Sequence, residues 1–160
     1  MEDSLAERFL RDERTFWLTG AWICILFLTT NLPWHLENYD QAKPAFSSFE
    51  MVHEGHWLYQ RMPLDPVAQK PPFFGWVSTI SYELTRWWDL AWRLPSLLSA
   101  LAISILLLRA ASLAYGRTAG LISLGAFGFN LLSARLATLV ATDMLLALSI
   151  FLVGLLIWQK

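Results

Sequence analysis

Long hydrophobic runs, interrupted by short polar stretches, dominate this chain. The four longest lie at residues 15–34, from 94 to about 115, between Arg117 and Arg135, and between Asp143 and Lys160. A helix needs roughly 17–25 residues to cross a hydrocarbon layer about 30 Å thick. The first two runs meet this length, and the last two approach it with flanking cations that can reach the interface. The pattern predicts an all-α membrane protein with about four transmembrane helices.

The segment between the first two runs has helical periodicity instead of continuous hydrophobicity. In residues 72–88 the apolar side chains recur at helical spacing, and hydroxyl and charged residues occupy the other face. A weaker pattern of the same kind covers residues 42–52, and Gly55 would end that helix. Both patterns predict amphipathic helices that lie in the membrane surface. Simple packing of these helices on the bundle is the alternative.

The composition supports a membrane protein and excludes other classes. Of the 160 residues, 56% are hydrophobic and nine are tryptophan, whereas soluble domains average about 45–50% apolar residues. The net charge of -1 and the lack of a Lys/Arg run argue against a nucleic-acid partner. The single cysteine, Cys24, permits neither an internal disulfide nor a cysteine-based metal site.

The cations near the ends of the runs fall on one side of the predicted bundle. They are Arg8, Arg11, Arg14, Arg109, Arg117 and Lys160. Because Lys and Arg are enriched on the cytoplasmic side, residues 1–15 are expected to be a cytoplasmic segment and residues 35–93 an extracytoplasmic loop. The polar N-terminus and the lack of a cleavage site favour an uncleaved anchor. The expected location is the plasma (inner) membrane, crossed several times.

Asp40 follows the first run in the stretch ENYDQAKPAF. One interpretation is a helix N-cap, because its carboxylate can accept hydrogen bonds from the free amides of a first turn. The other is a general base, because a carboxylate near apolar surface gains basicity and can take a proton from an attacking hydroxyl. The residues alone leave both interpretations open.

Lys70 directly precedes Pro71 and Pro72, where the first amphipathic pattern begins. Each proline fixes its own φ and pushes the preceding residue toward an extended conformation. Lys70 is therefore expected to be held extended beside a helix start, with Pro72 at the first helical position. A cation and free amides at headgroup depth suit a phosphate. The alternative is a snorkelling lysine at a loop-to-helix junction.

Two further ionised residues stand where later runs begin. Arg93 could bind a phosphate or pair with Glu83 or Asp89, and the pairing is favoured. Asp143 opens the fourth run, where a carboxylate also interacts well with the helix dipole. Because Asp40 and Asp143 both fall on the predicted outer side, they could line one cavity, and ionised residues at such places are candidates for function.

The stretch His53-Glu54-Gly55-His56 contains metal-ligand residue types. Its histidines are three residues apart, not four as in the helical zinc motif, and Gly55 disfavours a continuous helix. No metal ligand is therefore assigned, and no cofactor is expected.

Four short motifs occur in a particular order: Tyr39-Asp40-Gln41-Ala42, Gln69-Lys70-Pro71-Pro72, Arg93-Leu94-Pro95-Ser96 and Ala141-Thr142-Asp143-Met144. In this order and spacing the chain resembles the N-terminal part of the membrane glycosyltransferases of the C-type superfamily. It is most similar to the aminoarabinose transferase of lipid A and the related protein mannosyltransferases, and the resemblance covers nearly the whole chain.

The resemblance implies a function and a site. Such enzymes move a hexosyl or pentosyl group from a polyprenyl-phosphate carrier to a lipid or protein acceptor on the extracytoplasmic face. By this resemblance Asp40 is the catalytic carboxylate, Lys70 binds the carrier phosphate, and Asp143 lines the same cavity. Arg93 is a further candidate for substrate binding. The expected partners are the sugar donor, the acceptor and membrane lipids.

The chain departs from the family at several points. Gln41 and Gln69 stand where acids are common, which argues against metal assistance. Pro44 is expected to shift the start of the first loop helix. Family members also have many more spans, so residues 16–160 are expected to be the N-terminal part of such a membrane domain, as a fragment or a degenerate remnant.

A second interpretation belongs to another functional class. In it the chain is a small helical membrane protein that binds lipid or a partner and performs no chemistry, and Lys70 and the tryptophans anchor it at the interface. A channel or transporter subunit has less support, because no run carries a charge at mid-depth or a proline in its interior.

Overall fold

All regular structure in the described part of the chain is helical. The computed structural model describes residues 12–30, 36, 39–58 and 71–158, and these contain no strand. The helices are α2 (Glu13–Thr30), α3 (Tyr39–Glu54), α4 (Phe73–Thr85), α5 (Trp88–Tyr115), α6 (Arg117–Gly128), α7 (Leu131–Thr138) and α8 (Asp143–Trp158). The predicted all-α class is confirmed.

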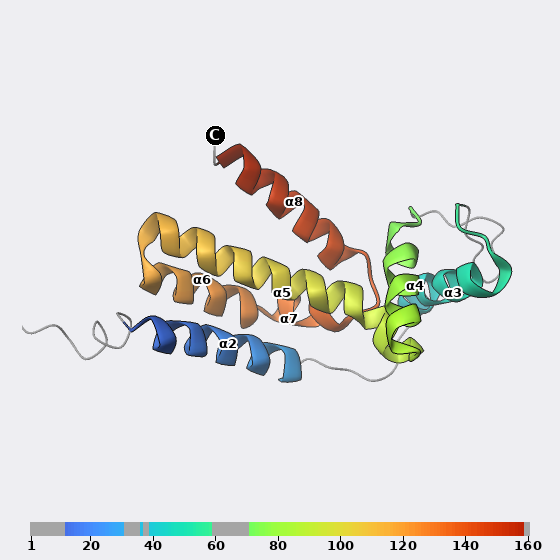
Figure 1. The fold of residues 1–160 in the computed structure, drawn as a ribbon, viewed down its shortest axis with the longest axis horizontal. Coiled ribbons are helices and arrows are strands. Elements are labelled where there is room, and N and C mark those ends of the chain that lie inside the picture. The colour runs from blue at the N-terminus through green and yellow to red at the C-terminus, as the bar shows by residue number, and fades with distance from the viewer. Residues whose placement is uncertain (1–11, 31–35, 37–38, 59–70, 159–160) are drawn as a thin grey trace, which may run out of the picture.

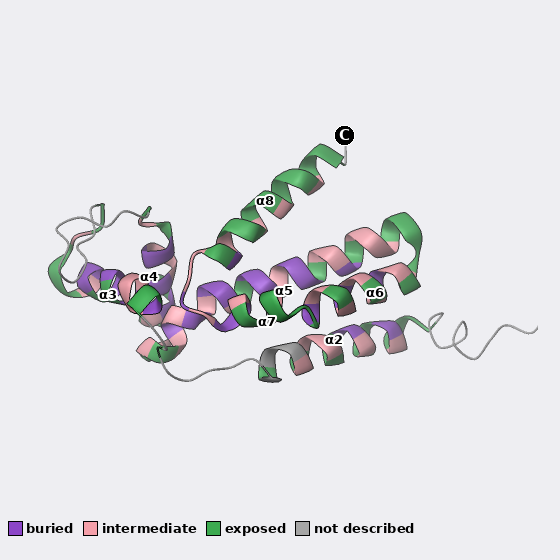
Figure 2. Ribbon diagram, turned by 180° about the vertical axis from the view of Figure 1, so that it is seen from behind, coloured by how far each residue is buried: buried purple, intermediate pink, exposed green. Residues whose placement is uncertain are grey.

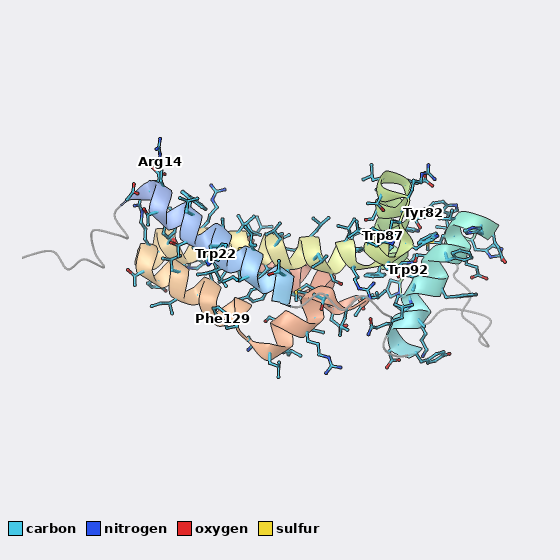
Figure 3. All side chains as sticks on the ribbon, turned by 90° about the horizontal axis from the view of Figure 1, so that it is seen from below. Arg14, Trp22, Tyr82, Trp87, Trp92 and Phe129 are labelled. Carbon is cyan, nitrogen blue, oxygen red and sulfur yellow. The ribbon has the colours of Figure 1, made fainter. Side chains whose placement is uncertain are left out.

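The helices form an elongated body with a smaller unit at one end (Figure 1). In the long body α5 lies against α6, and α2 packs on both. The smaller unit contains α3 and α4, and α4 packs on the first part of α5. Helix α8 begins near this unit and diverges from α5 toward its own C-terminus. Figure 3 shows Arg14 at the far end of the long body and Trp92 where this body meets the smaller unit.

Helix α5 begins six residues earlier than the sequence predicts. It starts at Trp88 and continues through Pro95, although proline removes a hydrogen bond and usually ends a helix. Two contacts hold the turn before the proline. The Trp88 and Trp92 rings stack with centroids 5.4 Å apart, and Arg93 Nη1 donates to the carbonyl oxygen of Asp89 at 2.9 Å.

The third hydrophobic run contains two helices, whereas one was expected. Helices α6 and α7 are bent by 61° relative to each other. The side chain of Asn130 causes the break, because its Oδ1 accepts hydrogen bonds from the amides of Leu132 (2.9 Å) and Ser133 (3.3 Å) and so caps α7. Just before it, the Phe129 amide donates a hydrogen bond to the Gly125 carbonyl oxygen at the end of α6.

One described helix, α5, is long and apolar enough to cross a membrane. The bent pair α6–α7 passes the same test only when taken as one span, and α8 is apolar but has 16 residues. The first turn of α2 carries Glu13 and Arg14, and residues 31–34 of its predicted run lie outside the described residues. The prediction of four spans is therefore unconfirmed.

Helix α4 buries several hydroxyl-bearing residues and exposes some of its large apolar ones. Its hydroxyl-bearing residues Ser78, Thr79 and Ser81 are buried against neighbouring helices. Among its apolar residues Phe74 is buried, whereas Ile80 is 61% and Leu84 81% exposed. The predicted two-faced helix is present, but the face that packs on the bundle is the hydroxyl face. The exposed apolar residues are therefore available to contact an environment outside the bundle.

Helix α5 also buries hydroxyl residues and exposes some large apolar ones, although Ile103 and Leu108 are buried. Figure 2 shows buried, intermediate and exposed residues along this helix. Ser96, Ser99 and Ser104 are buried, while Leu98 and Ile105 are exposed. The buried hydroxyls of Ser99 and Ser104 donate to carbonyls one turn back in their own helix, at 2.7 and 2.8 Å, and so leave no unsatisfied group. Small and hydroxyl residues between helices, with large apolar residues outside, are typical of membrane helix packing.

A glycine sets the spacing between α5 and α6. A Cβ at Gly120 would lie 2.9 Å from the Leu108 carbonyl oxygen and would overlap the Ser112 hydroxyl. The two helices therefore approach closely at the end of the body where they are joined. This is the small-residue contact that lets membrane helices pack without large side chains.

Candidate functional site

Helices α3, α4 and α5 and the segment before α8 meet at one hydrophobic cluster. Ala45 of α3, Phe74 of α4 and Val140 are buried together, and Trp92 of α5 packs against them. These residues are separated by up to 95 positions in the sequence. All four elements that carry or adjoin the predicted site residues thus converge here.

Hydrogen bonds from α5 hold the segment that leads into α8. The Ser96 hydroxyl donates to the carbonyl oxygens of Leu139 at 2.8 Å and Ala141 at 3.1 Å. Because Ser96 is fully buried, these bonds are shielded from water and fix the turn. The start of α8 is therefore positioned by the first turns of α5.

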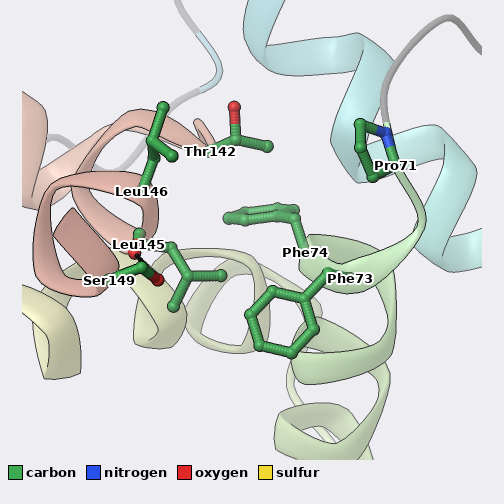
Figure 4. Close-up of a pocket in the computed structure, with 7 residues that line it drawn as sticks. All are labelled: Pro71, Phe73, Phe74, Thr142, Leu145, Leu146 and Ser149. Carbon is green, nitrogen blue, oxygen red and sulfur yellow. Dashed lines mark hydrogen bonds between the residues drawn. The ribbon is translucent and has the colours of Figure 1, made fainter. Parts of the chain in front are cut away.

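A cavity of about 310 Å³ lies beside this cluster, between the start of α4 and the start of α8 (Figure 4). The Phe73 and Phe74 rings form its wall on the α4 side, and Pro71 lies at the same helix start. The opposite wall is formed by Thr142, Leu145, Leu146 and Ser149. Apart from two hydroxyls the lining is apolar, so the cavity suits a hydrocarbon chain.

Lys70 lies outside the described residues, but its neighbour Pro71 lines the cavity. Pro72 precedes the helix at the N-cap position, with φ -72° and ψ -5°, and no side chain caps this end. The expectation that Pro72 is the first helical residue is therefore wrong by one position. The first-turn amides of α4 lack helical partners and lie next to the Lys70-Pro71 junction.

Asp143 is the first residue of α8, as the sequence predicts, and its side chain is exposed. Its neighbour Thr142 lines the cavity, and the Thr142 carbonyl accepts the first helical hydrogen bond from the Leu146 amide at 3.0 Å. The residues adjoining Lys70 and Asp143 thus line the same cavity, from opposite walls.

Asp40 is exposed and is the second residue of α3, inside the first turn and not at a cap. A carboxylate there is favoured by the helix dipole. Helix α3 continues through Pro44, so the expected shift of the helix start is wrong. The proline lies so near the start that its missing amide deprives only the Asp40 carbonyl of its helical donor. One residue later, Ala45 reaches the shared cluster.

Arg93 is 3% exposed and does not line the cavity. Its Nη1 donates to the Asp89 backbone oxygen at 2.9 Å. The alternative partner Glu83 instead pairs with Arg86, three residues further along. This contact joins Arg93 to the backbone of Asp89 and is not the predicted pairing with a carboxylate, and it favours a structural role at the start of α5.

The tryptophans near the site pack mainly against other aromatic rings. Trp88 stacks on Tyr82 with ring centroids 3.8 Å apart, and its ring centroid lies 5.5 Å from that of Phe49 and 5.4 Å from that of Trp92. These contacts join α3, α4 and α5. This group of packed aromatic rings connects the smaller unit to the long body.

The structure also groups three possible metal ligands that the sequence motif did not define. Ligand atoms of Glu50, Glu54 and His56 lie within 4.8 Å of one another. His53 is not among them, since its ring stacks on Phe49 and its Nδ1 lies 2.9 Å from the Phe49 carbonyl oxygen. Gly55, with φ +74°, turns the chain so that His56 approaches the two acids. The one-turn spacing of the two glutamates is the sequence signal that was missed.

Searches against known protein families, curated proteins and solved structures found no match to this chain.

Proposed function

We propose that the chain belongs to a glycosyltransferase that moves a sugar from a polyprenyl-phosphate carrier to a lipid or protein acceptor at the extracytoplasmic face of a membrane. The observation that carries the proposal is the apolar cavity whose walls include the neighbours of Lys70 and Asp143. A hydrocarbon chain in this cavity would bring its phosphate to the charged rim formed by the helix starts.

The proposed reaction is a displacement at the anomeric carbon of the sugar. The acceptor hydroxyl attacks that carbon, and Asp40 takes the hydroxyl proton. The bond between the anomeric carbon and the phosphate oxygen breaks, and its electron pair leaves with the polyprenyl phosphate. Lys70 and the amides at the start of α4 stabilise the negative charge on this leaving group. Asp143 contributes to the polar rim, and Arg93 holds the start of α5 from within.

The membrane setting is supported by the exposed apolar residues of α4 and α5. Ile105 is 43% exposed in the middle of α5, so water would reach it in a soluble protein, whereas acyl chains would cover it in a membrane.

A cysteine at Ile105, in a Cys24→Ser background, is therefore expected to resist a water-soluble maleimide in intact membranes and to react once the protein is denatured in detergent. A cysteine at the exposed polar residue Glu83 is the control, and it should react in both conditions. Equal and rapid reaction at both positions in membranes would refute the lipid-facing placement of α5.

Filling the cavity tests the binding site directly. Ser149→Phe places a large ring among the lining residues and is expected to reduce photocrosslinking to a polyprenyl-phosphate analogue by about tenfold or more, because the chain then has no room. Ile150→Phe is the matched control, since Ile150 is exposed and does not line the cavity. Equal crosslinking in the two variants would exclude this cavity as the carrier site.

A second candidate function is lipid binding without transfer. It is favoured by the lining itself, in which no described side chain is charged. This protein would retain polyprenyl phosphate but would not consume a sugar-linked carrier, so the turnover of the donor separates the two functions.

A further inference from the structure

A second cavity, of about 300 Å³, lies at the opposite end of the long body from the proposed active site. It lies where α2 begins, α5 ends and α6 begins, and it is open to the surface. Two arginines line it, Arg109 on α5 and Arg117 at the start of α6. Two cations from different helices therefore border one small space.

The two arginines differ in what holds them. Arg117 lies over the Phe16 ring, with its guanidinium carbon 5.6 Å from the ring centroid, and Phe16 is buried. Arg109 is exposed and forms no ion pair with any other residue in the described part of the chain. One arginine is thus fixed by packing, and the other is available to a ligand.

The remaining polar groups of the cavity are a hydroxyl and an acid. The Ser112 hydroxyl oxygen is buried and has no hydrogen-bond partner among the described residues. Glu13, at the start of α2, provides the negative charge of the lining. A ligand that matches this lining carries an anion for the two arginines and a cation for the glutamate.

The rim of this cavity is apolar and exposed. Trp17 is 44% and Leu113 85% exposed, and both line the cavity. Tryptophan favours the depth of lipid headgroups, and basic pockets between membrane helices bind phospholipid headgroups. A small soluble anion would use the arginines but not this rim.

We infer that this cavity binds the headgroup of a phospholipid of the phosphoethanolamine type. Arg109, Arg117 and the Ser112 hydroxyl donate to the phosphate oxygens, and Glu13 accepts from the ammonium. The acyl chains extend out of the cavity along the exposed side chains of Trp17 and Leu113. This inference depends on the membrane setting of the proposed function but not on sugar transfer, so the test below contains no sugar donor.

The test is native mass spectrometry of the detergent-purified protein, titrated separately with phosphatidylethanolamine, phosphatidylglycerol, phosphatidylcholine and inorganic phosphate. Phosphatidylethanolamine is expected to give the tightest binding. Arg109→Gln should weaken it about tenfold, the effect of losing one charge-assisted hydrogen bond, and it leaves the contact between Arg117 and Phe16 intact. Glu13→Gln should remove the preference for phosphatidylethanolamine over phosphatidylcholine, because only the first has an ammonium that donates hydrogen bonds.

The matched control is Arg86→Asn, which removes an exposed arginine at the other end of the molecule. Its binding should equal that of the unchanged protein. Equal binding by the Arg109→Gln protein, tighter binding of phosphatidylglycerol than of phosphatidylethanolamine, or binding of inorganic phosphate as tight as that of lipid would each overturn the inference. If lipid binds as expected but no sugar transfer is found, only the proposed transferase function fails.

Discussion

Replacing Lys70 with alanine is expected to abolish sugar transfer while the protein still inserts into the membrane. In the proposed reaction the lysine neutralises the phosphate from which the sugar departs, and removal of such a preorganised group typically costs about 10²–10³-fold in rate. Donor binding should weaken as well, because the ammonium also contacts the phosphate of the bound carrier. The measurement is transfer from a labelled donor in isolated membranes, normalised to the amount of inserted protein.

Two further variants make this result specific. Lys70→Arg retains a cation and should keep part of the activity. Arg86→Asn removes a cation at the far end of α4, and asparagine tolerates the left-handed conformation of this residue (φ 54°). It should leave transfer unchanged. Undiminished transfer by the Lys70→Ala protein would refute the phosphate-binding role.

Replacing Asp40 with asparagine is expected to remove turnover but not donor binding. Asparagine keeps the size of the side chain and loses the ability to accept the acceptor proton, and general-base catalysis contributes about 10²–10⁴-fold. Donor crosslinking and transfer should therefore separate in this variant, whereas both fall together in Lys70→Ala. The measurement is single-turnover transfer at a saturating donor concentration.

The matched control is Asp89→Asn, at another exposed acid in the first turn of a helix, here α5 of the long body. It should retain turnover. If Asp40→Asn instead prevents membrane insertion, its carboxylate serves only the helix start, and the assignment as a base is wrong.

Helical periodicity predicted the elements near the site well. The starts of α8 at Asp143 and of α4 at Phe73 follow from apolar spacing and from the Pro-Pro step, although α4 ends at Thr85, three residues before the end of the predicted pattern. These features are local, because they depend on residues within one or two turns of each other. Local patterns of this kind are recognisable in a single sequence.

The helix ends depended on side-chain contacts that periodicity does not reveal. Asn130 breaks the third run because its side chain accepts two backbone amides. Helix α5 passes through Pro95 because the preceding turn is held by stacked tryptophans and by Arg93. In each case a specific hydrogen bond or ring contact outweighed the simple rule.

The cavity itself could not be predicted from the sequence. Phe74 and Ser149 line it together although 75 positions separate them, and only the packing of α4 and α8 around the cluster of Ala45, Phe74 and Val140 brings them near each other. The outward position of Leu84 was equally hidden, because spacing shows that a helix has two faces but not which face the bundle buries.

The most direct test of the proposed function is the fate of the sugar donor when the purified gene product is reconstituted in vesicles with a polyprenyl-phosphate-linked sugar and membrane-extracted acceptors. The expected result is loss of the donor, with free polyprenyl phosphate and glycosylated acceptor formed in equal amounts, and no such change with the Asp40→Asn protein. Donor that is bound but remains intact in the presence of the unchanged protein would contradict the transferase function and leave a lipid-binding membrane protein.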